Sequence, residues 1–300
     1  MAIARPRKGK KPTVSIVGSG RLGTALAKAL ANSHYEIEAV LARRIAHARQ
    51  AAALIGSATL ALSEEELETL PRSKIILVTV PDGEILSTAE RIAALEASAR
   101  GRTVLHTSGA LAASEVLAPL AAAGFATGSI HPLVSISEPR SGAEKLRGAF
   151  YCVEGDVAAN RVARSLVKDL QGHSFHIDSE SKPLYHAAAV MASGHVTALV
   201  ALATEMLVQC GLDQKTARRV LLPLLESTVA NLSISEPATA LTGTFARGDL
   251  DTVKRHLNAL STKRLSEALA AYKLLGRRSL ELAQKKIVAE TRKKILRELE

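Results

Sequence analysis

Short apolar runs alternate with longer helical patterns over the first part of the chain. The runs are rich in Val, Ile and Leu and end at turn residues, whereas stretches between them, such as 114–124, are rich in Ala and Leu. Alternation of this kind predicts βαβ units on a doubly wound, mostly parallel α/β sheet. The predicted strands span residues 13–17, 36–42, 74–81, 102–109, 125–133, 149–155 and 173–179.

The strand pattern stops near Lys182, and long helical patterns follow it to the end of the chain. We therefore predict a disordered basic arm (residues 1–12), an α/β domain (residues 13–182) and an all-helical domain (residues 183–300). The predicted helices of the last segment are rich in Ala and Leu and carry more apolar surface than one helical layer covers. This excess predicts a homodimer built largely by the helical domain.

A glycine motif stands where the first predicted strand turns into a helix. The first glycine of G-x-G-x-x-G allows a tight turn, the second lets a pyrophosphate approach the backbone, and the third lets the helix pack closely. A helix N-terminus also offers free N–H groups to a phosphate. This context favours a Rossmann-type dinucleotide site over a turn that binds nothing. The predicted cofactor-binding residues of the turn are Gly18, Ser19, Gly20, Arg21, Leu22 and Gly23.

Two arginines follow the second predicted strand, at a place where NAD-binding proteins carry an acid that accepts hydrogen bonds from the ribose. A guanidinium there pairs with a 2′-phosphate instead, so Arg43 and Arg44 predict NADP(H) rather than NAD(H). The alternative is that both arginines simply begin the next, solvated helix.

The C-terminal ends of three predicted strands, where open α/β sheets bind ligands, carry clusters with polar residues. These are Pro81 and Asp82, then His106, Thr107 and Ser108, then His131. We expect Val80, Pro81, Asp82 and Thr107 to contact the cofactor. The simpler interpretations stay open: the proline ends a strand, and His106 is a partly buried, hydrogen-bonded imidazole.

Several side chains in this region and in the helical domain have the chemistry of a reaction site. His131, Tyr185 and His186 are candidates to move a proton, Ser108 and Ser193 to orient a substrate, and Arg247 to bind a carboxylate with the help of Asp249 and His256. Alternatives also exist: Asp249 caps a helix beside a solvated Arg247, and Tyr185 and His186 only pack against the sheet domain.

The composition is that of a soluble globular protein, with 47% hydrophobic and 23% charged residues. Because no apolar run reaches the length of a membrane span and the N-terminal residues lack a signal-peptide core, we expect a cytoplasmic protein that does not contact a membrane. Cys152 and Cys210 have no metal-ligand spacing, so we expect buried thiols and no metal site. The net charge of +10 lies largely at the two ends, without nucleic-acid motifs, and suits anionic cofactors equally well.

From Thr13 to about Leu260 the chain resembles bacterial proteins that join a Rossmann-like domain to a helical domain of unknown function, DUF2520. These are similar to deazaflavin-dependent NADP oxidoreductases and pyrroline-5-carboxylate reductase. The resemblance implies a helical domain like that of 6-phosphogluconate dehydrogenase, an NADP-type site and oxidoreductase activity. Where the family carries Ser-Asn-Tyr, this chain has Ser193, Gly194 and His195. The matching segments are VGSGRLGTALAKAL, VTVPDGEI, LHTSGAL, GSIHPLVSI, KPLYHAAAVMASGH, LLPLLESTVANL and ALTGTFARGDLDTVKRHLNAL.

Three functions are consistent with these observations. The first is an NADP-dependent reductase of a small, anionic carbonyl or imine compound, whose hydride comes from the nicotinamide. The second is a cofactor-binding sensor or regulatory protein without turnover. The third, which the missing motifs disfavour, is a nucleic-acid-associated protein that uses its basic ends.

Overall fold

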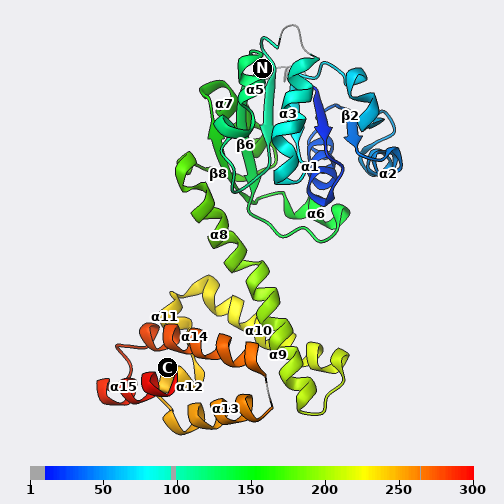
Figure 1. Cartoon of the computed structure of the whole chain (residues 1–300). Helices are drawn as coiled ribbons and strands as arrows, with labels where there is room; N and C mark the ends of the chain where they lie inside the picture. The colour runs from blue at the N-terminus through cyan, green and yellow to red at the C-terminus, as the bar shows by residue number, and fades with distance from the viewer. Residues whose placement is uncertain (1–10, 96–98, 264) are drawn as a thin grey trace, which may run out of the picture. The chain divides into compact units, whose positions relative to one another are not determined.

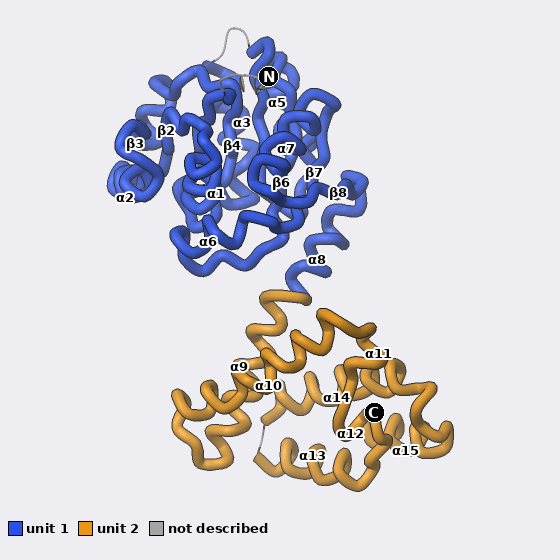
Figure 2. The backbone as a smooth tube through the Cα atoms, turned by 180° about the vertical axis from the view of Figure 1, so that it is seen from behind, with its two compact units in different colours: residues 1–191 blue, residues 192–300 orange. Residues whose placement is uncertain are grey.

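The computed structural model describes residues 11–95, 99–263 and 265–300 (Figure 1). They form two compact units that divide after Met191 (Figure 2). The change from strands to helices falls at Lys182, as the sequence indicates, so the first turns of that helix belong to the sheet unit. Most of the predicted basic arm lies outside the described residues, but Lys11 donates to the carbonyl of Ser33 at 2.7 Å and pairs with Asp169 at 2.8 Å.

The first unit is built on an eight-stranded sheet. Its strands are β1 (Val14–Val17), β2 (Ile37–Ala42), β3 (Leu60–Ser63), β4 (Ile75–Val78), β5 (Thr103–His106), β6 (Ala126–Pro132), β7 (Phe150–Gly155) and β8 (His173–Phe175). Its helices are α1 (Arg21–Asn32), α2 (Ile45–Ile55), η1 (Glu64–Thr69), η2 (Asp82–Glu84), α3 (Ile85–Ala94), α4 (Ala113–Val116), α5 (Ala118–Ala122), α6 (Pro139–Lys145), α7 (Val157–Asp169), η3 (Ser179–Ser181) and α8 (Lys182–Ala192).

The strands lie in the order β3-β2-β1-β4-β5-β6-β7-β8. Neighbouring strands are parallel except for β6 and β7, which are antiparallel. The predicted doubly wound, mostly parallel α/β fold is confirmed. Because the order reverses between β1 and β4, the crevice for a ligand is expected above their C-terminal ends.

Apolar side chains alternate between the two faces of the sheet. On β4, Ile75 and Leu77 pack with α1, α2, α6 and α7, whereas Ile76 and Val78 pack with α3, α4 and α5. Both faces of the central strands are therefore buried under helices, as parallel sheets require. This double burial explains why these strands read as continuous apolar runs.

The second unit is helical, as predicted. Its helices are α9 (Gly194–Gln209), α10 (Gln214–Ile234), α11 (Pro237–Ala240), α12 (Gly243–Arg247), α13 (Leu250–Thr262), α14 (Ser266–Leu282) and α15 (Ala289–Glu298). A small core of Val253, Leu280, Ile295 and Leu299 joins α13, α14 and α15. Helix α10 instead exposes large apolar side chains, such as Leu224 (64%) and Ile234 (83%).

Two expectations about the chain need correction. Cys152 is buried, but Cys210, at the end of α9, is exposed. Judged by length and composition alone, the helical segment Ser179–Gln209 could also cross a membrane. Only 6% of the residues in its most apolar window are buried. The expectation from the sequence missed this window because Ser, Gly, His and Thr residues interrupt its apolar runs.

Candidate active site

The glycine turn has the geometry that each glycine was predicted to permit. Gly18 has a φ of +113°, and a Cβ there would lie 2.7 Å from the carbonyl of Thr79. A Cβ on Gly23 would lie 2.1 Å from the carbonyl oxygen of Gly18, so the helix packs directly on the turn. By contrast, nothing lies within 4 Å of a Cβ on Gly20. The turn is thus closed at its first and third glycines and open at the second.

The open position adjoins the N-terminus of α1. Gly20 is the N-cap, no described side chain caps the helix, and its first turn carries no acid. The hydroxyl of Thr79 donates to the carbonyl of Gly18 at 2.6 Å, and that of Thr24 to the carbonyl of Ser19 at 3.1 Å, which fixes the turn. Arg21 is exposed and Leu22 half-buried beside it. The partial positive charge of the helix end is therefore not neutralised by a side-chain cap or by a first-turn acid, which favours the binding of an anion there.

The two arginines lie just past β2, on the surface of the sheet unit. Arg43 Nη2 pairs with Glu84 Oε1 at 3.1 Å, and its side chain is 70% exposed. Arg44 is exposed as well and is the N-cap of α2. Both predicted roles, surface charge and phosphate ligand, are compatible with this placement.

The residues that follow β4 and β5 are joined by a hydrogen bond. Ser108 Oγ donates to Asp82 Oδ2 at 2.9 Å and accepts the N–H groups of Ala110 and Leu111, each at 3.1 Å. Val80 is half-buried, Pro81 and Asp82 are exposed, and Thr107 is buried, with its N–H on the carbonyl of Val78. Ser108 therefore holds the loop after β5 against the start of η2.

His131 meets the first turn of α8. Its Nδ1 lies 2.7 Å from the hydroxyl of Tyr185, and the His186 ring stands edge-on to it, with 5.7 Å between ring centroids. A Cβ on Gly109 would lie 2.7 Å from His186 Cδ2 and 2.9 Å from His131 Nε2, so a glycine is needed where the loop passes the two rings. Three of the residues predicted to take part in the reaction, His131, Tyr185 and His186, thus come together in the structure.

Burial and neighbouring charge keep these groups neutral. Burial, then the charges of His186 and Lys182, lower the pKa of His131 to about 4. Burial, then the charges of Lys182 and His131, lower the pKa of His106 to about 3. Burial also raises the pKa of Tyr185 well above its usual range. At neutral pH the His131–Tyr185 contact therefore joins a neutral imidazole to a neutral phenol.

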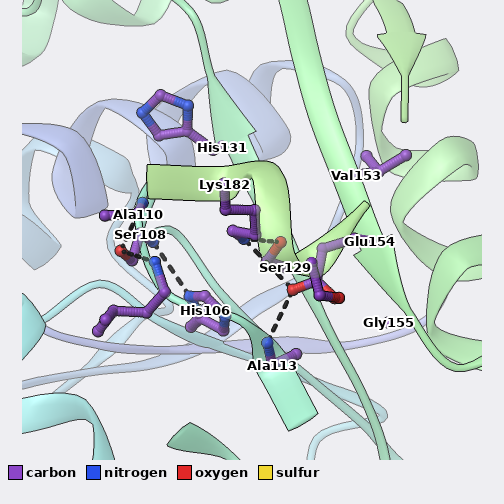
Figure 3. Close-up of polar contacts among 12 residues, drawn as sticks. His106, Ser108, Ala110, Ala113, Ser129, His131, Val153, Glu154, Gly155 and Lys182 are labelled. Atoms are coloured by element: carbon purple, nitrogen blue, oxygen red, sulfur yellow. Dashed lines mark hydrogen bonds and ion pairs between the residues drawn. The ribbon is translucent and has the colours of Figure 1, made fainter. Parts of the chain in front are cut away.

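Beneath His131 lies a polar cluster that the sequence interpretation missed (Figure 3). Lys182 Nζ donates to Ser129 Oγ at 2.7 Å and pairs with Glu154 Oε1 at 3.3 Å, and both charged side chains are almost fully buried. Glu154 also accepts the N–H of Ala113 at 2.7 Å. The sequence signal was an acid inside the apolar run 149–155, which the strand pattern alone does not explain.

His106 belongs to the same buried layer. It is 0% exposed, and its Nδ1 accepts the N–H of Ser108 at 3.1 Å. Its Nε2 has no hydrogen-bond partner among the described residues. The simpler interpretation expected a partly buried, hydrogen-bonded imidazole; His106 is instead fully buried, and only one of its nitrogens is hydrogen-bonded among the described residues.

The remaining predicted residues belong to the second unit. Ser193 is the non-helical residue that separates α8 from α9. Asp249 caps α13, accepting from the N–H of Thr252 at 3.0 Å, so the capping interpretation holds for this residue. Arg247 is exposed at the end of α12, and His256 Nδ1 lies 2.8 Å from the hydroxyl of Tyr272.

Two family models match this sequence. A Rossmann-like domain covers residues 5–132, and DUF2520, a domain of unknown function, covers residues 149–279. The chain therefore carries a match to a Rossmann-like domain followed by a match to DUF2520. In this Rossmann–DUF2520 chain the glycine turn lies within the first match, and Lys182, Tyr185 and His186 lie within the second. No curated protein matches the chain.

Solved structures share the fold of this Rossmann–DUF2520 protein over most of its length. A candidate NADP oxidoreductase of Bacteroides fragilis is 23% identical, with a TM-score of 0.71, over 91% of this chain and 99% of that chain. An imine reductase of Myxococcus stipitatus, solved with NADP+, is 18% identical, with a TM-score of 0.62, over 96% and 99%. Plasmodium falciparum pyrroline carboxylate reductase, solved with NADP bound, is 14% identical, with a TM-score of 0.58, over 91% and 99%.

Proposed function

We propose that the protein is an NADP(H)-dependent oxidoreductase that reduces a small carbonyl or imine compound. The observation that carries the proposal is the glycine turn, which is closed at Gly18 and Gly23, open at Gly20 and continued by an uncapped helix N-terminus. Two proteins of the same fold, the imine reductase and the pyrroline carboxylate reductase, are solved with NADP. When bound, the nicotinamide supplies the hydride.

The chain's own residues would hold that cofactor along the edge of the sheet. The turn at Gly20 would bind the diphosphate, because the backbone there is accessible and the dipole of α1 favours an anion. Arg43 and Arg44 would pair with the 2′-phosphate, Arg43 leaving Glu84 to do so. Asp82 and Thr107, after β4 and β5, would border the nicotinamide end.

His131 and Tyr185 would manage the proton that accompanies hydride transfer. If Nδ1–H of the neutral His131 donates to the Tyr185 oxygen at 2.7 Å, the phenol O–H would stay free to donate to a developing oxygen or nitrogen anion. His186, edge-on to His131, would help to hold the His131 ring in place. Ser108, in the same unit as His131 and Tyr185, would orient the substrate, whereas the roles of Ser193 and Arg247, in the second unit, stay predictions from the sequence.

Cofactor binding is tested by fluorescence titration of NADPH and NADH. The proposal expects tighter binding of NADPH, and it is overturned if neither dinucleotide binds to folded protein. Turnover is tested by transfer of deuterium from stereospecifically labelled NADPH to a panel of carbonyl and imine compounds. His131→Ala should lower the rate with any compound that reacts, whereas NADPH binding with no transfer to any compound would favour the sensor alternative.

We also propose that the helical unit forms a homodimer in the cytoplasm. Leu224 and Ile234 are 64% and 83% exposed, so α10 leaves apolar side chains uncovered in a single copy of the helical unit. Light scattering at micromolar concentration tests this, and a monomeric mass would reject it. Sedimentation with vesicles tests the membrane as the alternative cover for the same surface.

A further inference from the structure

Lys182 is completely buried at the place where α8 meets the sheet. Its ammonium group has two partners in the described residues, Ser129 Oγ at 2.7 Å and Glu154 Oε1 at 3.3 Å (Figure 3). Glu154 in turn accepts from the N–H of Ala113 and, at 3.3 Å, from the hydroxyl of Ser179. The ion pair therefore links α8 to β6, β7, the start of α4 and the segment just before α8.

The strand register places the side chains of His106, Ser129 and Glu154 in one row. Ser129 is the partner of His106 on β5 and of Glu154 on β7, so the three residues are direct neighbours across β5, β6 and β7. A lysine and a glutamate buried in this way cost several kcal/mol of desolvation each, and an apolar pair of the same volume is often as stable. Stability alone therefore does not explain why Lys182 and Glu154 are buried here.

The row adjoins both halves of the His131–Tyr185 contact. His131 is two residues beyond Ser129 on β6, so both side chains point to the same face of the sheet. Tyr185 and His186 are three and four residues beyond Lys182, so they lie one helical turn from its buried ammonium group. Any sliding or rotation of the first turn of α8 would separate the Tyr185 hydroxyl from His131 Nδ1.

We propose that Lys182 is the positioning residue of the site: its contacts with Glu154 and Ser129 lock the first turn of α8 onto β6 and β7 and so hold Tyr185 against His131. The inference deepens the proposed function and rests on it for its use in a reaction. It does not make Lys182 a catalytic residue, because a fully buried ammonium group cannot touch substrate.

Charge is the second part of the same arrangement. The titratable groups that face His131 are Tyr185 and His186 from α8, Lys182 below them, His106 from β5 and Cys152, its register partner on β7. Among these, the Lys182 ammonium and a protonated His186 disfavour a charged His131. Positioning and charge can be separated experimentally, since only positioning sets the hydrogen bond at Nδ1.

The test uses ¹⁵N-histidine NMR on the full-length protein. The Nδ1 resonance of His131 reports its contact with Tyr185, and Tyr185→Phe supplies the reference for a lost contact. The main variant combines Lys182→Met with Glu154→Gln, so that no lone buried charge remains. Lys168→Met, an exposed lysine on α7, is the matched control.

In the folded double variant we expect the Nδ1 resonance to move to its position in Tyr185→Phe. If the Nδ1 resonance keeps its wild-type position, the positioning role is overturned. If the double variant does not fold, the same measurement is made on Ser129→Ala, which removes the hydrogen bond between Lys182 Nζ and Ser129 Oγ. It should move the resonance part of the way, and an unchanged resonance would again overturn the role.

The proposed function fails separately. An NADPH titration of the wild-type protein that shows no binding would reject the oxidoreductase, but the NMR comparison would still decide whether Lys182 positions α8.

Discussion

Lowering the pH from 8 to 5 should destabilise the sheet unit through two histidines, of which His106 is buried and His131 half-buried. His106 is 0% exposed and leaves Nε2 without a partner among the described residues, and its pKa is lowered to about 3. His131, half-buried against Tyr185 and His186, has a pKa lowered to about 4. Both imidazoles resist protonation as long as the unit stays folded.

The size of the effect follows from the difference between folded and unfolded pKa values. The unfolded chain binds each proton near pH 6.5, so neither histidine costs stability above that pH. As the pH falls below it, the unfolded state gains protons that the folded state does not bind, and the free energy of unfolding decreases. At pH 5 the loss is about 2 kcal/mol for each histidine, or about 4 kcal/mol together.

The assay compares wild type with His106→Asn, whose amide oxygen can still accept the N–H of Ser108. Hydrogen exchange of peptides that cover β5 and β6, followed at increasing urea, gives the free energy of opening of this unit alone. Between pH 8 and pH 5 the wild type should lose about 2 kcal/mol more than the variant. His47→Asn, an exposed histidine on α2, controls for the substitution. Equal losses in wild type and His106→Asn would refute the assignment of His106 as a buried neutral group.

Three further predictions concern the cofactor turn and the site. Arg43→Ala should weaken NADPH binding about tenfold and leave NADH binding unaffected, whereas Glu84→Gln, which frees that arginine, should tighten NADPH binding. Both affinities are measured by calorimetry. Equal effects on the two dinucleotides would argue against a contact with the 2′-phosphate. Gly23→Ala should lower the free energy of unfolding by more than about 2 kcal/mol, because the added methyl group would meet the carbonyl oxygen of Gly18. Gly20→Ala should keep wild-type stability but bind NADPH weakly. Thermal unfolding and titration separate the two variants, and equal stability would disprove the close packing. Gly109→Ala should displace the two imidazoles behind it, seen as shifted histidine NMR signals, and unshifted signals would contradict that contact.

Much of the fold could be predicted because buried parallel strands are continuous apolar runs. Residues 74–81, 102–109 and 125–133 contain β4, β5 and β6, and the glycines follow β1 as expected. Strand β3 was missed, because this edge strand is short and leaves Leu60 exposed. The antiparallel pairing of β6 and β7 was also not predicted, because direction depends on the connection through α6 rather than on the composition of either strand.

The candidate site was predicted in part. The predicted strand ends indicated Ser108 and His131, and in the structure these residues contact Asp82 and Tyr185. Lys182 was interpreted as the boundary between two patterns, since a lysine in sequence is far more often solvated than buried. Its pairing with Glu154 depends on the neighbouring positions of β6, β7 and α8, which are separated along the chain and brought together only by folding.

Because Glu154 binds Lys182, the strand domain cannot be cut out cleanly at the point where the strands end. A shortened chain that stops at Ser181 would keep every strand but lose the ammonium group that neutralises a 2%-exposed carboxylate. Such a fragment would have to take up a proton or admit water between β6 and β7, whereas one that runs on through Met191 keeps its charge balance. The first turns of α8 are, in this sense, the last part of the sheet unit to be made by the ribosome, and the unit is electrostatically complete only when they have emerged.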